Sequence, residues 1–232
     1  MTSFKLAAVA VTAALALGTA AQAQDKPEFS FNVGVASDYM FRGFSQSDNT
    51  QQVYGGADVG IGIFYAGTWL SNVDFRDDST DMEYDLYAGF KPTLGPVSLD
   101  VGIVRYGYTN QPDGDDLDFW EGKVAGSIPA GKGTVGAAVY YTPENFDQTG
   151  KATYVELNGS MPVTDKLSVS GAIGRQSVEG PSDYETWNLG VGYAINDVFG
   201  IDLRYWDTNV EKADDTPKVA TGRIVVGLKA AF

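Results

Sequence analysis

The sequence contains no cysteine and no histidine. Without cysteine the chain can form no disulfide bond and carries no thiolate chemistry. Without histidine it lacks the commonest general base and the commonest metal ligand, and we expect neither a metal site nor any other cofactor. Long apolar runs are also scarce. The run at residues 6–17 is shorter than the roughly 20 residues that a transmembrane helix needs.

Basic side chains are scarce as well. The chain has 16 lysine and arginine residues against 30 aspartate and glutamate residues, a formal net charge of −14. Nucleic-acid binding depends on basic side chains that neutralise phosphates. The charge balance therefore argues against nucleic acid as a partner.

The first 23 residues have the pattern of a secretory signal peptide. Lys5 precedes the apolar run, and Ala21-Gln22-Ala23 is a small-x-small cleavage site. A membrane-anchoring helix is the alternative interpretation, but the run is too short for one. We therefore expect residues 1–23 to be removed on export and residues 24–232 to form one domain.

The end of the chain alternates between two kinds of side chain. Even-numbered positions from Ile224 to Phe232 are apolar, whereas Arg223 and Lys229 stand at odd-numbered positions. A period of two indicates a strand between two different environments. A strand that ends on an aromatic residue resembles the C-terminal signal by which outer-membrane β-barrels are recognised, although Ala230 stands where that signal often has a second aromatic. We expect Phe232 to be an assembly signal for the barrel-assembly machinery.

The same alternation recurs along the chain and predicts an all-β fold, a transmembrane antiparallel up-and-down β-barrel of about twelve strands. In the first strand, the step from Phe29 to Tyr39 covers about 25 Å at the usual rise and tilt. That length matches the apolar band of an outer-membrane barrel, with an aromatic residue at each border. The expected strands cover about 29–39, 51–63, 65–75, 83–91, 97–108, 117–128, 134–141, 153–161, 167–176, 184–195, 198–206 and 219–232.

The connections between these strands alternate between two kinds. Short turns rich in proline and glycine are expected at 64–65, 92–96, 129–133, 162–166 and 196–197. Longer acidic loops are expected at 76–82, 110–116 and 208–218. Bacterial barrels have short periplasmic turns and long extracellular loops, so an even strand count places both termini in the periplasm. A soluble β-sandwich is the alternative, but it would leave the loop asymmetry and the membrane-sized strands without a cause.

Three stretches near the N-terminus resemble a known family. They are Ser37 to Gln46 (SDYMFRGFSQ), Trp69 to Phe75 (WLSNVDF) and Glu83 to Phe90 (EYDLYAGF). They are similar to conserved-looking stretches of the TorF-like porins, small outer-membrane proteins, and the similarity is strongest over residues 29–90. The resemblance implies a porin-like barrel in the outer membrane of a Gram-negative bacterium and defines no substrate.

The inward positions of the predicted strands collect charges of both signs. We expect them to line the lumen as Asp38, Arg42, Asp58, Glu83, Asp85, Lys91, Asp100, Glu121, Lys123, Glu156, Asp202, Arg204, Arg223 and Lys229. Twelve strands give a backbone diameter of about 24 Å, which side chains narrow to a small or partly blocked pore. Such a pore passes small solutes or ions, with a weak preference for cations because carboxylates outnumber basic groups. The alternative is a closed barrel with a structural or surface-binding role.

Three arginines, Arg42, Arg105 and Arg175, stand near the end of the predicted barrel that carries the long loops. Arg42 should lie close to Arg223, with Asp38 and Asp85 as its nearest counter-charges. Arg105 and Arg175 fall on the outward face just beyond the apolar run. We expect these two to contact outer-membrane lipid and the phosphates of lipopolysaccharide at the rim of the barrel.

Enzymatic functions find little support in the sequence. Some twelve-stranded outer-membrane proteins are lipases that use serine, histidine and asparagine, and this chain lacks the histidine that would act as the base. The stretch Asp113-Gly114-Asp115-Asp116 is faintly similar to a calcium loop but lacks the full spacing. We therefore expect a protein that is not an enzyme and a solvated acidic loop at this position.

Overall fold

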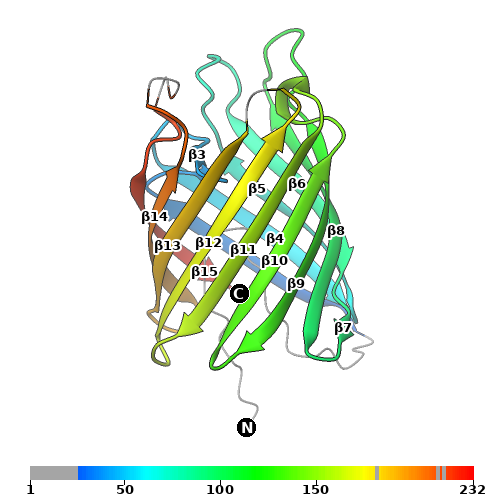
Figure 1. The fold of residues 1–232 in the computed structure, drawn as a ribbon, viewed down its shortest axis with the longest axis vertical. Coiled ribbons are helices and arrows are strands. Elements are labelled where there is room, and N and C mark those ends of the chain that lie inside the picture. Colours follow the sequence, from blue (N-terminus) through cyan, green and yellow to red (C-terminus); the bar gives the residue numbers. More distant parts are fainter. Residues whose placement is uncertain (1–25, 181–182, 213–214, 216–217) are drawn as a thin grey trace.

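The computed structural model describes residues 26–180, 183–212, 215 and 218–232. The expected signal peptide at 1–23 lies outside the described residues. Within them, twelve antiparallel strands form a closed barrel in which the order around the ring follows the order in the chain (Figure 1). These strands are β1 (Glu28–Ala36), β4 (Gln52–Ile61), β5 (Phe64–Asn72), β6 (Met82–Phe90), β8 (Val97–Thr109), β9 (Phe119–Ala130), β10 (Gly133–Thr142), β11 (Ala152–Pro162), β12 (Leu167–Val178), β13 (Tyr184–Ala194), β14 (Phe199–Thr208) and β15 (Arg223–Ala231).

The barrel closes because β1 pairs with both β4 and β15. The ladder between β1 and β15 continues to the end of the chain, where the backbone N–H of Phe232 donates to the carbonyl of Phe31 at 2.9 Å. The remaining described elements are the short strands β2 (Met40–Phe41), β3 (Phe44–Ser45) and β7 (Thr93–Leu94), and a 3-10 turn at Phe146–Gln148. The twelve-stranded antiparallel barrel predicted from the alternation is thus confirmed.

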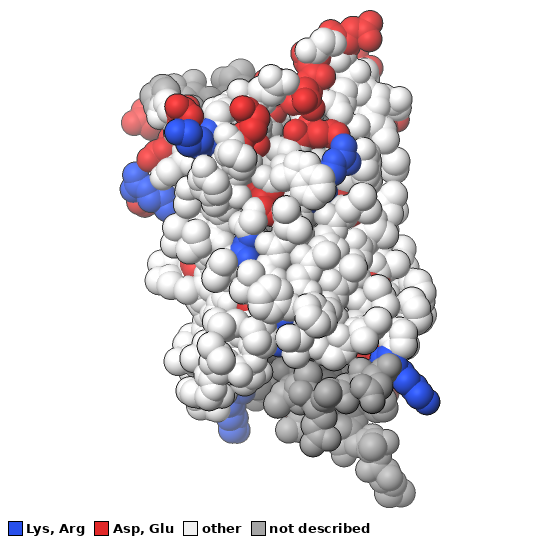
Figure 2. Space-filling model, turned by 90° about the vertical axis from the view of Figure 1, so that its right-hand side faces the viewer, with Lys and Arg blue, Asp and Glu red and all other residues white. Residues whose placement is uncertain are grey.

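Alternate residues face outwards and form a broad apolar band around the barrel. Large apolar side chains such as Leu157, Ile173 and Ile224 are exposed on it. The middle of the face in Figure 2 carries few charges, and the acidic side chains gather above it. Soluble monomers rarely expose so large an apolar surface, whereas the outward face of a transmembrane barrel is built this way. One closed sheet with this exterior excludes the β-sandwich alternative.

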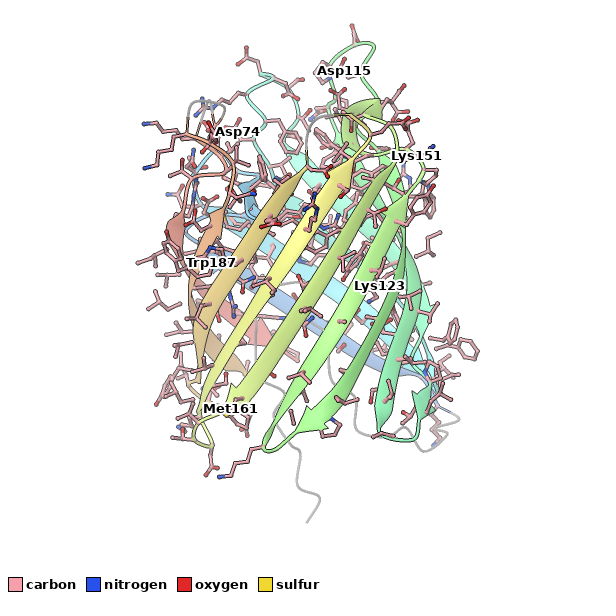
Figure 3. The ribbon with its side chains drawn as sticks, viewed as in Figure 1. Asp74, Asp115, Lys123, Lys151, Met161 and Trp187 are labelled. Carbon is pink, nitrogen blue, oxygen red and sulfur yellow. The ribbon has the colours of Figure 1, made fainter. Side chains whose placement is uncertain are left out.

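The two ends of the barrel differ in their connections. Long loops lie at one end, where Asp115 and Lys151 are found, and short turns lie at the other, near Met161 (Figure 3). We call these the loop end and the turn end. By register, the first strand begins and the last strand finishes beside the short turns of the turn end. The acidic loops and the proline- and glycine-rich turns of the sequence are therefore segregated in space.

Several strand boundaries differ from the prediction by a few residues. The turn expected at 64–65 lies instead at Gly62 and Ile63, because Gly62 adopts a left-handed conformation (φ +61°) and Ile61 pairs with Phe64. The final strand begins at Arg223 rather than at residue 219. At residues 62–63 the apolar alternation continues although the chain turns, and Val219 bonds to Ser45 of the first loop instead of to the ladder.

The first strand also ends earlier than expected, at Ala36 rather than at Tyr39. From Ser37 the chain turns into the barrel, and Tyr39 becomes buried instead of marking an outer aromatic border. Its hydroxyl donates to Glu83 on β6 at 2.8 Å. This early departure from the wall carries the following residues into the lumen.

Candidate functional site

The first long loop forms a small hairpin from β2 and β3. The two strands are joined by Arg42 and Gly43, which both have positive φ (48° and 90°). Two left-handed residues in a row make the tight two-residue turn that suits the twist of a hairpin. Glycine is required at the second position because a Cβ there would lie 2.4 Å from Oγ1 of Thr186 on β13. The tip of the hairpin thus presses against the barrel wall.

Hydrogen bonds hold the base of this hairpin. Asp38 accepts bonds from the hydroxyls of Ser45 at 2.6 Å and Ser47 at 3.0 Å. Its other carboxylate oxygen lies 2.7 Å from Nη1 of Arg223 on β15. The carbonyl of Tyr39 accepts from the backbone N–H of Gln46 at 2.7 Å. The base is therefore attached beside β1 and β15, on one side of the barrel.

The tip reaches the other side through Arg42. Its guanidinium donates two parallel bonds to Glu121 on β9, at 2.8 and 2.7 Å, and a third to Gln176 on β12 at 3.1 Å. It also lies over the rings of Tyr140 and Tyr154, at 4.9 and 4.3 Å from their centroids. The hairpin therefore crosses the lumen from β1 to the wall formed by β9–β12.

The ion pair between Arg42 and Glu121 is removed from solvent. The two side chains are 8% and 1% exposed, and the hydroxyl of Tyr106 donates a further bond to Glu121 at 3.1 Å. Bidentate geometry and extra hydrogen bonds are what a buried pair needs to offset its desolvation. The counter-charges predicted for Arg42 were wrong: Asp38 pairs with Arg223 instead, because the hairpin carries Arg42 away from β1.

Further toward the turn end the lumen holds separate polar groups. Lys123 pairs with Asp100 at 2.6 Å, and the hydroxyl of Tyr65 donates to the same carboxylate at 2.7 Å. Lys91 lies 4.5 Å from the centroid of the Tyr65 ring. Asp58 accepts from the hydroxyl of Tyr87 at 2.7 Å.

A third set of contacts lies on the wall formed by β11–β14. Arg204 pairs with Asp202 at 3.1 Å and donates to Asn188 at 2.6 Å. Glu156 accepts from Asn158 at 2.9 Å. Lys229 lies on β15, the strand next to this wall, and its side chain is only partly exposed. The candidate lumen residues thus gather into several ion pairs and hydrogen-bond networks distributed along the barrel rather than into one cluster.

Most of these inward groups are shielded from solvent, although to different degrees. Glu83, Asp85 and Glu121, which surround the hairpin, are buried. Asp58 and Glu156, nearer the turn end, are partly exposed. The hairpin and its partners therefore fill the lumen near the loop end, whereas nearer the turn end buried groups such as Asp100 and Asp202 alternate with partly exposed ones.

The two outward arginines pair with acidic neighbours. Arg105 contacts Asp118 and donates to the hydroxyl of Tyr84 at 3.0 Å. Arg175 is 59% exposed and lies 3.1 Å from Asp183. The expected contact of both with lipopolysaccharide stays a prediction.

Several functional contacts were missed at the sequence level. Gln176, Tyr140 and Tyr154 contact Arg42. In the sequence only their inward-facing positions pointed to them, and such a position does not identify a partner. Among the described residues no cluster of three or more potential metal-binding side chains is found, and none of their helices has the length and hydropathy to cross a membrane.

Comparisons with known proteins place the fold among porins. The structure is similar to the KdgM porin with a TM-score of 0.59 and 9% identity, over 88% of this chain and 99% of that one. It is similar to the NanC porin with a TM-score of 0.58 and 8% identity, over 88% and 99%. No curated protein matches the sequence. The resemblance to the TorF-like porins stays a prediction, because the family model that matches has a different name. That model covers residues 20–232, and the chain belongs to its family, described as "Bacterial protein of unknown function (Gcw_chp)".

Proposed function

We propose that this protein is an outer-membrane channel for the passive diffusion of small solutes or ions, narrowed near its loop end by the β2–β3 hairpin. The observation that carries the proposal is the hairpin itself, which crosses the lumen and is held there by Arg42 and Glu121. A loop folded into a barrel restricts what can pass between its walls. The apolar outer band and the charged lumen are the features of a membrane channel.

The proposed orientation follows from the two ends. The long acidic loops face the extracellular side, and the turn end with both termini faces the periplasm, as in other bacterial barrels. A cleaved signal peptide and recognition of Phe232 by the barrel-assembly machinery would bring the chain there. Lipid and lipopolysaccharide then surround the apolar band, with Arg105 and Arg175 at its outer border.

Charge supports a weak preference for cations. Among the described residues of the six connections at the loop end, at 37–51, 73–81, 110–118, 143–151, 179–183 and 209–222, sixteen are acidic and five are basic. Negative potential at a channel mouth raises the local concentration of cations, and salt screens it over about 8 Å at physiological ionic strength. The preference should therefore weaken as the salt concentration rises.

A closed barrel with a structural or surface-binding role is the second candidate. The buried packing around the hairpin favours it, because Glu83 and Glu121 are almost inaccessible to solvent. The two functions differ in conductance: a narrowed channel passes discrete current steps, and a permanently closed barrel passes none.

The test is single-channel recording on purified protein in planar bilayers. Discrete steps, with a reversal potential in a potassium chloride gradient that shows modest cation selectivity, support the channel. Absence of steps both in the wild type and in a variant that lacks residues 40–45 contradicts it and favours the closed barrel. Faster migration of unboiled than of boiled protein in a detergent gel shows that each preparation is folded.

A further inference from the structure

A cavity opens at the loop end, above the hairpin. Its volume is about 440 Å³, and it lies among the first loop, the loops that follow β5, β10 and β14, and the loop-end parts of β8, β9, β12 and β13. Phe41 and Phe44 of the hairpin contribute to its lining, and so do Phe75 and Phe146 from two other loops. This volume is enough for a small organic molecule.

Aromatic rings dominate the lining. Phe75, Tyr108 and Phe146 contact one another edge to face, with centroids 5.1 to 5.5 Å apart. Phe44 and Tyr184 form a second pair at 4.8 Å. Aromatic faces carry partial negative charge and attract cations placed over them, most strongly where water is excluded.

The lining carries two arginines and two aspartates, and both arginines are already paired with carboxylates. Both terminal nitrogens of Arg42 already donate to Glu121, and Arg76 pairs with Asp48. Asp74 is a further acidic group of the lining. Acidic side chains also gather at this end of the molecule in Figure 2, in line with the excess of carboxylates in the loops.

We propose that this cavity binds an organic cation, a small molecule with a substituted ammonium group and a compact apolar body. The aromatic rings can pack against the apolar body and attract the ammonium group, and the acidic loops attract the positive charge of the ligand. An anion would meet repulsion from the loops, and a neutral molecule would gain nothing from them. This inference rests on the proposed function only for the side of the membrane from which the ligand arrives, because binding itself requires no conduction.

The test is isothermal titration calorimetry on the full barrel in a non-ionic detergent, with benzyltrimethylammonium as the probe. We expect saturable binding that weakens as potassium chloride is added. Neopentylbenzene, in which carbon replaces the charged nitrogen, should bind at least tenfold more weakly, and benzenesulfonate should not bind. Equal binding of the neutral probe, or tighter binding of the anion or of a methyl pyranoside, would overturn the proposal.

Paired variants then locate the site. Phe146→Leu keeps apolar volume but removes the ring, and we expect about five- to tenfold weaker binding. Phe146→Tyr keeps the ring and should bind like the wild type. If both variants bind the probe unchanged while the gel shows them folded, the cation is not in this cavity. Because no bilayer is involved, these outcomes are independent of whether the channel conducts.

Discussion

Replacing Arg42 by alanine should release the hairpin from the far wall of the barrel. The substitution removes the two bonds to Glu121, the bond to Gln176 and the contacts with the rings of Tyr140 and Tyr154. It also leaves the carboxylate of Glu121 buried without its cation. Breaking one partner of a buried pair costs about 3–5 kcal/mol.

That cost sets the size of the expected effect. At about 1.4 kcal/mol per tenfold change, the ratio of docked to undocked hairpin falls by between about 10² and 10⁴. In single-channel recordings, Arg42→Ala should therefore show larger or longer-lived open levels than the wild type.

Two further variants define the cause. Arg175→Ala is the matched control, because it removes an arginine that is 59% exposed on the outer face, and its conductance should equal that of the wild type. Arg42→Met combined with Glu121→Leu removes both charges and keeps apolar volume, and it should recover much of the closed behaviour. If Arg42→Ala is folded and conducts like the wild type, Arg42 does not hold the hairpin across the pore.

Three other predictions concern the surface. Deletion of Phe232 removes two backbone bonds to Phe31, about 1 kcal/mol each, from a residue whose side chain is 69% exposed. The deletion should thus reduce the outer-membrane yield in cells far more than it reduces the free energy of unfolding. Normal yield would contradict the role of Phe232 as an assembly signal. If Arg175 binds lipopolysaccharide phosphates, Arg175→Ala should weaken binding of lipopolysaccharide to the detergent-solubilised barrel, and Arg175→Lys should weaken it less; unchanged binding in both would refute the contact. Partial burial raises the pKa of Asp77, but hydrogen bonds from the Thr80 hydroxyl and from backbone N–H groups outweigh it and hold that pKa below its usual value. The loop that this carboxylate stabilises should loosen as pH falls through the lowered pKa, and Thr80→Ala should raise the pKa in a titration followed by nuclear magnetic resonance.

The barrel could be predicted from the sequence because each strand is a local pattern. Alternation along 119–130 or 184–194 reports two environments without knowledge of any partner, so strand number and closure followed. The hairpin could not be predicted in this way. Asp38 and Arg42 share the parity of the first strand, and nothing local distinguishes an extended strand from a chain that has left the wall.

The partner of Arg42 shows the same limit. Glu121 stands 79 residues further along the chain, and inward parity alone allows many other carboxylates. Asp38 was the nearer choice by sequence, but it is taken by Arg223. Only the path of the hairpin across the lumen selects Glu121 over Asp38 as the partner of Arg42. The turn at Gly62 is a different case, because its glycine was a local signal that the apolar residues beside it obscured.

The junction between β1 and β15 also has a consequence for how the chain folds. Its ladder joins five residue pairs, from Asn32 with Ala231 to Ala36 with Gly227, whereas β1 and β4 share nine. Each pair brings together residues about two hundred positions apart, so this ladder has a high entropic cost and few bonds to offset it. We expect its amide protons to exchange first and its pairing to form last. Until then the sheet has two free edges, and a chain halted at that stage can pair with another copy instead of with itself.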